Sequence, residues 1–172
     1  MRAMLSVLAF LVAVSAAGQT PTSATYVTGE DIQANLNVRQ HVAVNPVPNL
    51  RVVDAGGYNI AVGVLYRQKP IGHAAVHFKV SEVYHVIDGA ATLVTGGAIV
   101  DAKTRSADAL DVRLENGPSA EGTVIEGGES RRIKAGDVVI IPAGVPHQFT
   151  KVEGSITYIV VRVDPGRVLP PK

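Results

Sequence analysis

Short apolar runs separated by turn residues fill the chain from Leu50 onward, and this pattern predicts β-strands. The runs are rich in valine, isoleucine and tyrosine, and glycine, proline or aspartate stands between them at the spacing of an all-β sandwich or barrel. No helix-length segment connects them, so a parallel sheet is not expected. We expect strands near residues 51–54, 58–66, 73–80, 82–88, 90–95, 98–101, 122–126, 129–134, 137–141, 145–151 and 155–163.

The first 18 residues have the pattern of a secretory signal peptide. Arg2 supplies the positive end, an apolar run extends from Met4 to Val14, and small residues follow at positions 15–18. The alternative is a membrane anchor, but a run of about 11 residues is short of the roughly 20 that span a bilayer. We therefore expect a periplasmic or secreted protein that has no membrane attachment after cleavage.

The rest of the chain is predicted to form a leader, a β-domain and a C-terminal tail. Residues 19–49 predict a leader with one short helix near 29–36, which begins with two acidic residues. Residues 50–163 make up the β-domain, in which the polar stretch 102–121 predicts a long loop that can hold a helical turn. Prolines predict an extended tail over residues 164–172.

Composition limits the classes of function. Of the 172 residues, 47% are apolar and 18% are charged, which suits one folded domain rather than a disordered chain. The formal net charge is +1 and no large cluster of basic residues occurs, so nucleic acid is not an expected partner. There is no cysteine, which excludes disulfides, thiolate nucleophiles and cysteine-based metal sites.

The most informative segment extends from Gly136 to His147. The apolar run 138–141 predicts a strand that crosses the core, and Pro142 and Gly144 predict a tight corner after it. His147 then enters the next strand, so we expect its side chain to point back toward the barrel interior.

This segment resembles the second sequence motif of the cupin family, in which glycine, proline, glycine and histidine recur at fixed spacing. All four positions match, although Lys151 replaces an asparagine that the family often has four residues after the histidine. The resemblance implies a single antiparallel double-stranded β-helix, which is the jelly-roll barrel of cupins, with the short N-terminal helix before it. It is compatible with the whole of residues 50–163 and is similar to small exported bacterial cupins.

The first cupin motif is present only in part. His77 fits its second histidine, and Glu82 and Gly89 fit its glutamate and its final glycine. Ala75 stands where the family has its first histidine, and Lys69 stands where it has its first glycine. One of the usual metal ligands is therefore missing.

The resemblance implies His77, Glu82 and His147 as metal ligands. Two neutral imidazoles and one carboxylate suit a divalent transition ion, namely Fe, Mn, Zn, Ni or Co. Three ligands leave positions open for water, O₂ or substrate, whereas a structural zinc is normally fully coordinated. The alternative is a barrel that has lost its metal together with the first histidine. A buried Glu82 needs a cation, a proton or a partner, and its place beside two histidines favours the metal.

Strand alternation assigns the neighbouring side chains to a face of the sheet. Tyr84 shares the parity of Glu82 and should point into the barrel, either as a catalytic base beside the metal or as a core residue with its hydroxyl satisfied. His85 has the opposite parity and should face outward. His73 lies about 13 Å from His77 at the rise of a strand, so it joins the site only if a bulge shortens the gap. Otherwise it faces water or substrate at the barrel mouth.

Three functions agree with these features. The first is a metal-dependent enzyme that acts on a small molecule by dioxygenase, isomerase or lyase chemistry. The second is a non-catalytic barrel that binds a small ligand or sugar, and the third is a storage or structural role through dimerisation. The fold alone does not choose among them. Because cupins commonly pair through sheet edges or N-terminal strands, we expect a homodimer, to which residues 38–48 could contribute.

Overall fold

The computed structural model of the protein describes residues 23–41 and 49–172. The predicted signal peptide, residues 1–18, lies outside these ranges, as does most of the segment expected to mediate dimer contacts. No helix in the described part of the chain is long and apolar enough to cross a membrane. In chain order the regular elements are α1 (Gly29–His41), β1 (Arg51–Asp54), β2 (Asn59–Arg67), β3 (Ala74–His77), β4 (Ser81–Thr95), β5 (Ala98–Ile99), β6 (Lys103–Thr104), a π-helical turn (Val112–Asn116), β7 (Ser119–Gly122), β8 (Ile125–Glu126), β9 (Glu129–Lys134), β10 (Val138–Ile141) and β11 (His147–Asp164).

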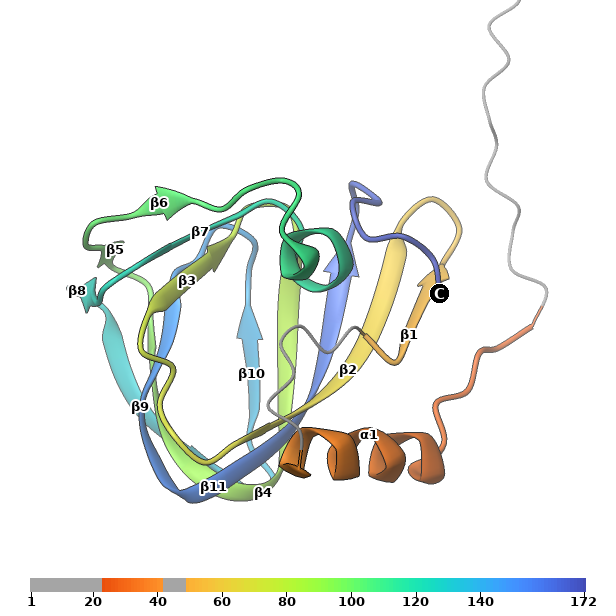
Figure 1. Ribbon diagram of the computed structural model, residues 1–172, viewed down its shortest axis with the longest axis horizontal. Helices are drawn as coiled ribbons and strands as arrows, with labels where there is room; N and C mark the ends of the chain where they lie inside the picture. Colours follow the sequence, from red (N-terminus) through yellow and green to blue (C-terminus); the bar gives the residue numbers. More distant parts are fainter. Residues whose placement is uncertain (1–22, 42–48) are drawn as a thin grey trace, which may run out of the picture.

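The strands form an antiparallel barrel (Figure 1). Within the described residues one nine-stranded sheet has the order β1-β2-β11-β3-β7-β6, and β4 pairs with β9, β10 and β11. β5 and β8 form a separate two-stranded sheet. All of these pairings are antiparallel, as expected for strands joined by turns rather than by helical crossovers. The predicted all-β jelly-roll class with a short N-terminal helix is confirmed.

Helix α1 begins with a reciprocal cap. The Thr28 hydroxyl accepts a hydrogen bond from the backbone N–H of Asp31, and the Asp31 carboxylate accepts one from the backbone N–H of Thr28. The helix ends at His41 rather than near residue 36, because it packs against β2 and buries Leu36. Tertiary packing of this kind stabilises turns that local propensity alone would leave marginal.

The strands β4 and β11 are each continuous where the sequence predicted two shorter strands. Gly89 has a φ of 77°, and a Cβ at this position would lie 2.0 Å from the carbonyl oxygen of Ser155. Only glycine therefore lets the two strands approach here. The register between β4 and β11 shifts at three places, and such bulges bend a strand without ending it. The predicted breaks near residues 89 and 152–154 are bends, and they allow both strands to pass through the two halves of the barrel.

The polar stretch 102–121 is not the single long loop that the sequence predicted. The helical turn that the prediction allowed is present as the π-helical turn, but the stretch also contains β6 and the beginning of β7, and β7 pairs with β3. The sequence Ser-Ala-Glu-Gly of β7 has little intrinsic preference for a strand, so its pairing with β3 overrides local propensity. This pairing sets Ser119 directly opposite His77.

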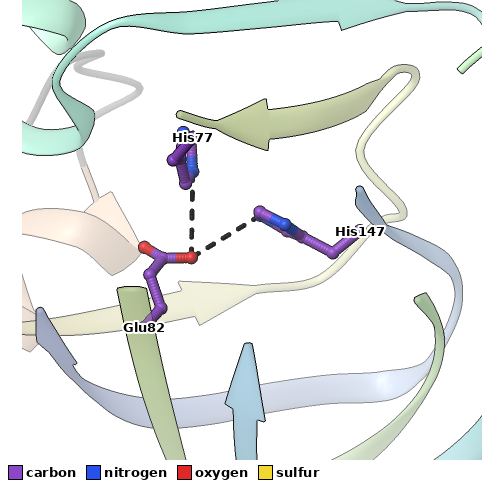
Figure 2. A group of neighbouring side chains, drawn as sticks. All are labelled: His77, Glu82 and His147. Atoms are coloured by element: carbon purple, nitrogen blue, oxygen red, sulfur yellow. Dashed lines mark ion pairs between the residues drawn. The ribbon is translucent and has the colours of Figure 1, made fainter. Parts of the chain in front are cut away.

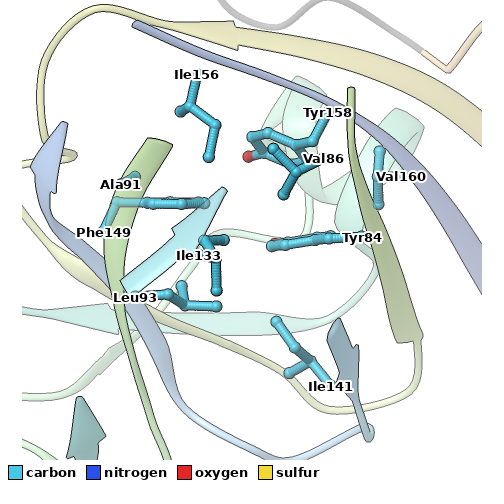
Figure 3. Packing of buried hydrophobic residues seen from close by; sticks show 10 residues of the cluster. All are labelled: Tyr84, Val86, Ala91, Leu93, Ile133, Ile141, Phe149, Ile156, Tyr158 and Val160. Atoms are coloured by element: carbon cyan, nitrogen blue, oxygen red, sulfur yellow. The ribbon is translucent and has the colours of Figure 1, made fainter. Parts of the chain in front are cut away.

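Side chains from both long strands fill the barrel interior (Figure 3). Three aromatic rings lie at its centre: the ring centroid of Tyr84 is 4.6 Å from that of Tyr158 and 6.3 Å from that of Phe149. Such contacts add to the stabilisation that apolar burial supplies. The buried members of this core are Tyr84, Val86, Ala91, Leu93, Ile133, Ile141, Phe149, Ile156, Tyr158 and Val160.

The tail after β11 returns to the barrel. The Asp164 carboxylate accepts hydrogen bonds from the backbone N–H groups of Val168 and Leu169, and the backbone of Lys172 exchanges hydrogen bonds with that of Val52. The Leu169 side chain is fully buried, which contributes roughly 1.5–3 kcal/mol. The tail is therefore part of the folded domain.

Candidate metal centre

Three strand ends bring His77, Glu82 and His147 together in the barrel interior (Figure 2). The Nε2 atom of His77 lies 3.7 Å from Oε2 of Glu82, and the Nε2 atom of His147 lies 3.5 Å from the same oxygen. One candidate ligand atom from each residue lies within 4.8 Å of the other two. All three side chains are buried. The three residues that the sequence singled out thus form one cluster.

The corner before β11 connects the two histidines through the backbone. The N–H of Gly144 donates to the carbonyl oxygen of His77 over 2.8 Å, and Val145 N–H donates to Pro142 to close the turn. Gly144 has a φ of 84°, a conformation that glycine adopts without strain. The proline and glycine of the second motif therefore place His147 relative to His77, which belongs to the first motif.

Hydrogen bonds at Nδ1 determine the tautomer of each imidazole. The Ser119 hydroxyl donates its hydrogen to the Gly117 carbonyl oxygen, so it accepts from Nδ1–H of His77, which is 2.9 Å away. Nδ1 of His147 lies 3.3 Å from the carbonyl oxygen of Val145, which can only accept. Both rings therefore carry hydrogen on Nδ1 and present the lone pair of Nε2 to Glu82. This is the usual arrangement around metal-bound histidines.

Glu82 is held by two donors. Oε1 accepts a hydrogen bond from Nε of Arg162 over 2.9 Å, and Oε2 accepts one from the Tyr84 hydroxyl over 2.8 Å. Arg162 and Glu82 are 4% and 2% exposed, so this is a buried ion pair. The expectation that a buried Glu82 argues for a metal therefore needs correction, because a protein cation already balances its charge.

Arg162 is the functional residue that the sequence analysis missed. It lies directly opposite Glu82 in the pairing of β11 with β4. Its other nitrogens donate to the side-chain oxygens of Asn49, over 2.5 Å, and Asn116, over 3.3 Å. A signal was available, because Arg162 shares the inward parity of Tyr158 and Val160, and a lone charge at an inward position of an apolar strand needs a partner.

The pKa values of Glu82 and His77 follow from these surroundings. Burial opposes ionisation of Glu82, but charge interactions with His77, Arg162 and His147 outweigh it and lower the pKa to about 2. Burial lowers the pKa of His77 to about 3. Arg162 is paired with Glu82 and carries its charge at every pH at which the protein is folded, so it is a permanent counter-charge for this carboxylate.

The depressed pKa of His77 predicts a pH-dependent stability of the metal-free protein. Between the unfolded value of 6.5 and the folded value of about 3, the unfolded chain binds a proton at His77 that the folded protein does not. The contribution of His77 to the free energy of unfolding is therefore fully present above pH 6.5. It is lost as the pH falls, by up to about 1.4 kcal/mol per pH unit.

Urea unfolding between pH 6.5 and 5 in the presence of a chelator measures this effect. We expect His77→Gln to flatten the slope and the exposed control His73→Gln to retain it. Equal slopes in wild type and His77→Gln would contradict the buried, neutral state of this ring.

Tyr84 points into the barrel, as strand parity predicted, and is 4% exposed. Its hydroxyl donates to Glu82, and burial followed by the charge of Glu82 raises its pKa well above the usual value. Tyr84 is therefore protonated and acts as a hydrogen-bond donor to the carboxylate. Its predicted action as a catalytic base stays a prediction.

The other residues weighed from the sequence lie outside the cluster. His73 is at the barrel mouth, where its side chain is 46% exposed and its Nε2 lies 3.7 Å from Glu121. Ala75, at the position of the missing histidine, pairs with His147 and Glu121 across the neighbouring strands. His85 is exposed, as its parity predicted. Within the described residues no further histidine or carboxylate belongs to the cluster.

The donor set fits a divalent transition ion. Ligand atoms bound at about 2.0–2.2 Å in adjacent positions are roughly 3–3.5 Å apart, close to the two separations that Glu82 Oε2 makes with the imidazoles. Two imidazole lone pairs converge on a carboxylate oxygen whose only donor among the described residues is the Tyr84 hydroxyl. Three acceptors facing one point need a cation, a water or a proton between them.

Residues 119–166 match the family model of the cupin domain. The C-terminal part of the barrel is therefore similar to a cupin domain. The matched range includes His147 and Arg162 but not His77 and Glu82, so it bears on the second motif of the cupin and not on the first. No curated protein matches the sequence.

The chain is also similar, at low sequence identity, to several solved structures. The EutQ protein of Clostridium difficile is 18% identical with a TM-score of 0.35, and the match covers 62% of this chain and only 58% of EutQ. A cupin protein from Bacteroides fragilis is 14% identical over 78% of this chain and 91% of its own, with a TM-score of 0.39. Hydroquinone 1,2-dioxygenase from Sphingomonas sp. TTNP3 is 18% identical over 77% and 75% of the two chains, with a TM-score of 0.41.

Proposed function

We propose that this protein is a cupin that holds one divalent transition ion with His77, Glu82 and His147 and acts on a small molecule beside it. The observation that carries the proposal is the convergence of two imidazole lone pairs and a carboxylate oxygen, with both Nδ1 atoms engaged by hydrogen bonds on the far side. Three protein ligands suit a catalytic site better than a structural one, because they leave coordination positions open. Dioxygenase, isomerase and lyase chemistry are the candidate reaction types.

The protein side chains would prepare the site for such an ion. The bound ion would supply Lewis acidity toward a substrate oxygen. Arg162 holds Oε1 of Glu82 and leaves Oε2 facing the two imidazoles. Ser119 and the Val145 carbonyl group keep the rings in the required tautomer. Tyr84 keeps a proton beside the carboxylate, and we propose that this hydroxyl is the group that exchanges a proton during turnover.

Metal analysis of the purified protein tests the proposal. After expression in medium supplemented with Fe, Mn, Co, Ni and Zn, we expect about one equivalent of a single ion per chain. His147→Ala should lose it, whereas the exposed control His85→Ala should retain it. Metal-free wild type from every supplemented culture would exclude the proposed centre.

The alternative function is a non-catalytic barrel that binds a small ligand or a sugar. The buried pair of Arg162 and Glu82 favours it, because this pair balances the charge of the cluster without an ion. Alanine at position 75 also leaves the cluster one ligand short of the usual cupin site. Ligand-induced thermal stabilisation without turnover, in protein that contains no metal, would support this alternative over the enzyme.

Export and homodimer formation are further proposals. The signal-peptide pattern of residues 1–18 supports a periplasmic or secreted location, which N-terminal sequencing of the protein expressed with its leader would test. On β10, Val138 is 59% and Ile140 is 70% exposed, and an apolar strand of this kind supports a contact with a second copy.

A further inference from the structure

Arg162 contacts Glu82 through only one arm of its guanidinium group. Nε donates to Oε1 of Glu82 over 2.9 Å, and among the described residues no hydrogen bond joins Arg162 to Oε2. A guanidinium often binds a carboxylate with two parallel N–H groups, one to each oxygen. Arg132 binds Glu153 in this way, with Nε on Oε1 over 3.0 Å and Nη2 on Oε2 over 2.7 Å. In the buried pair the second arm is missing.

The second arm of Arg162 goes to Asn116 instead. Nη2 donates to Oδ1 of Asn116 over 3.3 Å, and Nη1 donates to Oδ1 of Asn49 over 2.5 Å. Both acceptors are neutral amide oxygens, so they engage the N–H groups without adding a charge to the site. Within the part of the chain that the structure describes, Oε2 of Glu82 then has the Tyr84 hydroxyl as its only donor. This oxygen is the one that faces the two imidazoles.

The π-helical turn between β6 and β7 fixes both amide groups (Figure 1). Asn116 is its last residue, and Nδ2 of Asn49 donates to the carbonyl oxygen of Leu114 within it over 3.0 Å. Gly63 of β2 leaves room for the contact, because a Cβ there would lie 3.4 Å from Oδ1 of Asn49 and 3.5 Å from Nη1 of Arg162. Turns of this type are frequent at functional sites.

We propose that Asn116 is a positioning residue of the metal centre, which holds the second arm of Arg162 away from Glu82 so that Oε2 can bind a divalent ion. Without this acceptor, Nη2 of the buried arginine would lack a partner, and closing the fork on Oε2 would satisfy it. The ion would then compete with Arg162 for this oxygen. The inference rests on the proposed function, since it explains how a ligand atom of that centre is kept available.

Replacing Asn116 with leucine removes the acceptor and keeps the size of the side chain. We expect Asn116→Leu to bind Co(II) at least about tenfold more weakly than wild type in competition with a fluorescent chelator. Asn116→Asp keeps an acceptor oxygen at the same reach, so it should bind Co(II) at least as tightly as wild type. Asn59→Leu is the matched control, because Asn59 is also buried and donates to the carbonyl oxygen of Leu169. It should retain the wild-type affinity.

Two further measurements separate positioning from a general effect on the fold. In the Arg162→Met background there is no second arm to hold, so adding Asn116→Leu should leave the Co(II) affinity unchanged. A general loosening of the π-helical turn would weaken binding in both backgrounds. Crystal structures of the metal-free proteins give a readout that needs no ion. In Asn116→Leu, Nη2 of Arg162 should lie within hydrogen-bond distance of Oε2 of Glu82, as it does not in wild type.

Any of three results overturns the inference. These are Nη2 of Arg162 still away from Oε2 in crystals of Asn116→Leu, equal Co(II) affinities of Asn116→Leu and wild type, and equal losses in the wild-type and Arg162→Met backgrounds. Should Asn116→Leu not fold, weaker Co(II) binding by Asn116→Asp than by wild type overturns it. Wild type that binds no divalent ion overturns the proposed function and this inference together. Normal binding by wild type with any of the other results overturns the role of Asn116 alone.

Discussion

Exchanging Glu82 for glutamine is expected to reduce the affinity for divalent transition ions by more than about 100-fold, since loss of a mere outer-shell partner typically costs about 10- to 100-fold. The amide removes the negative charge that the two imidazoles face. It also presents a neutral oxygen or an N–H group where the ion needs an anionic oxygen. The remaining pair of histidines offers too few ligands to hold an ion against water.

Competition with a fluorescent metal chelator measures this loss directly. Glu82→Gln leaves the buried Arg162 without its counter-charge, so the double variant Glu82→Gln/Arg162→Met provides a second measurement in a site of neutral charge. Tyr84→Phe is the matched control, because it removes the other hydrogen bond to Glu82 but keeps the carboxylate. Metal affinity that is unchanged in both glutamine variants would show that Glu82 is not a ligand.

Replacing Arg162 with methionine is expected to destabilise the metal-free protein by about 3–5 kcal/mol at pH 7. The change leaves the ionised carboxylate of Glu82 in the barrel core, where the Tyr84 hydroxyl is its one remaining donor in the part of the chain that the structure describes. It also leaves the side-chain oxygens of Asn49 and Asn116 without the donor they share. An unpaired buried charge destabilises the protein by far more than the intact ion pair stabilises it.

The response of Arg162→Met to metal tests whether the ion pair of Arg162 and Glu82 belongs to the metal site or is only structural. A saturating divalent ion at Oε2 would replace the lost counter-charge, so Co(II) should stabilise Arg162→Met more than it stabilises wild type. The double variant Glu82→Gln/Arg162→Met should recover most of the stability without metal, because neither charge is left unpaired. Chemical denaturation with and without Co(II) gives both comparisons, and Arg131→Met serves as the exposed control. Equal stabilisation of Arg162→Met and wild type by Co(II) would place the ion away from Glu82.

Much of the fold and of the candidate site followed from local features of the sequence. Alternation of apolar and polar residues predicted the strands, and it assigned Tyr84 to the interior and His85 to the surface, as the structure confirms. The complete second motif and the partial first motif predicted the cluster of His77, Glu82 and His147. The predictions from parity were correct because they depend on residues close together in the chain, whereas the cluster, whose members lie on three different strands, was implied by the resemblance to the two motifs.

The errors arose where distant segments meet. Gly89 was taken for the end of a strand, but its φ and the close approach of Ser155 make it a bend in β4. The segment that includes β7 was predicted as loop, yet pairing with β3 makes it a strand and gives His77 its Ser119 partner. Local propensity is weak enough for such pairing to override it.

By itself the sequence determined the class of fold, the three candidate ligands and the direction of Tyr84. Only the tertiary structure decided what surrounds them. Arg162 reaches Glu82 from 80 positions further along the chain, and Arg67 meets Tyr158 from 91 positions away. The pattern of residues along β2, β4 or β11 does not predict these two contacts. They form only when the three strands lie side by side in the folded barrel. The charge balance of the site is for this reason a property of the folded barrel and not of any sequence motif. This balance bears on the choice between the two proposed functions, a metal enzyme and a binding barrel.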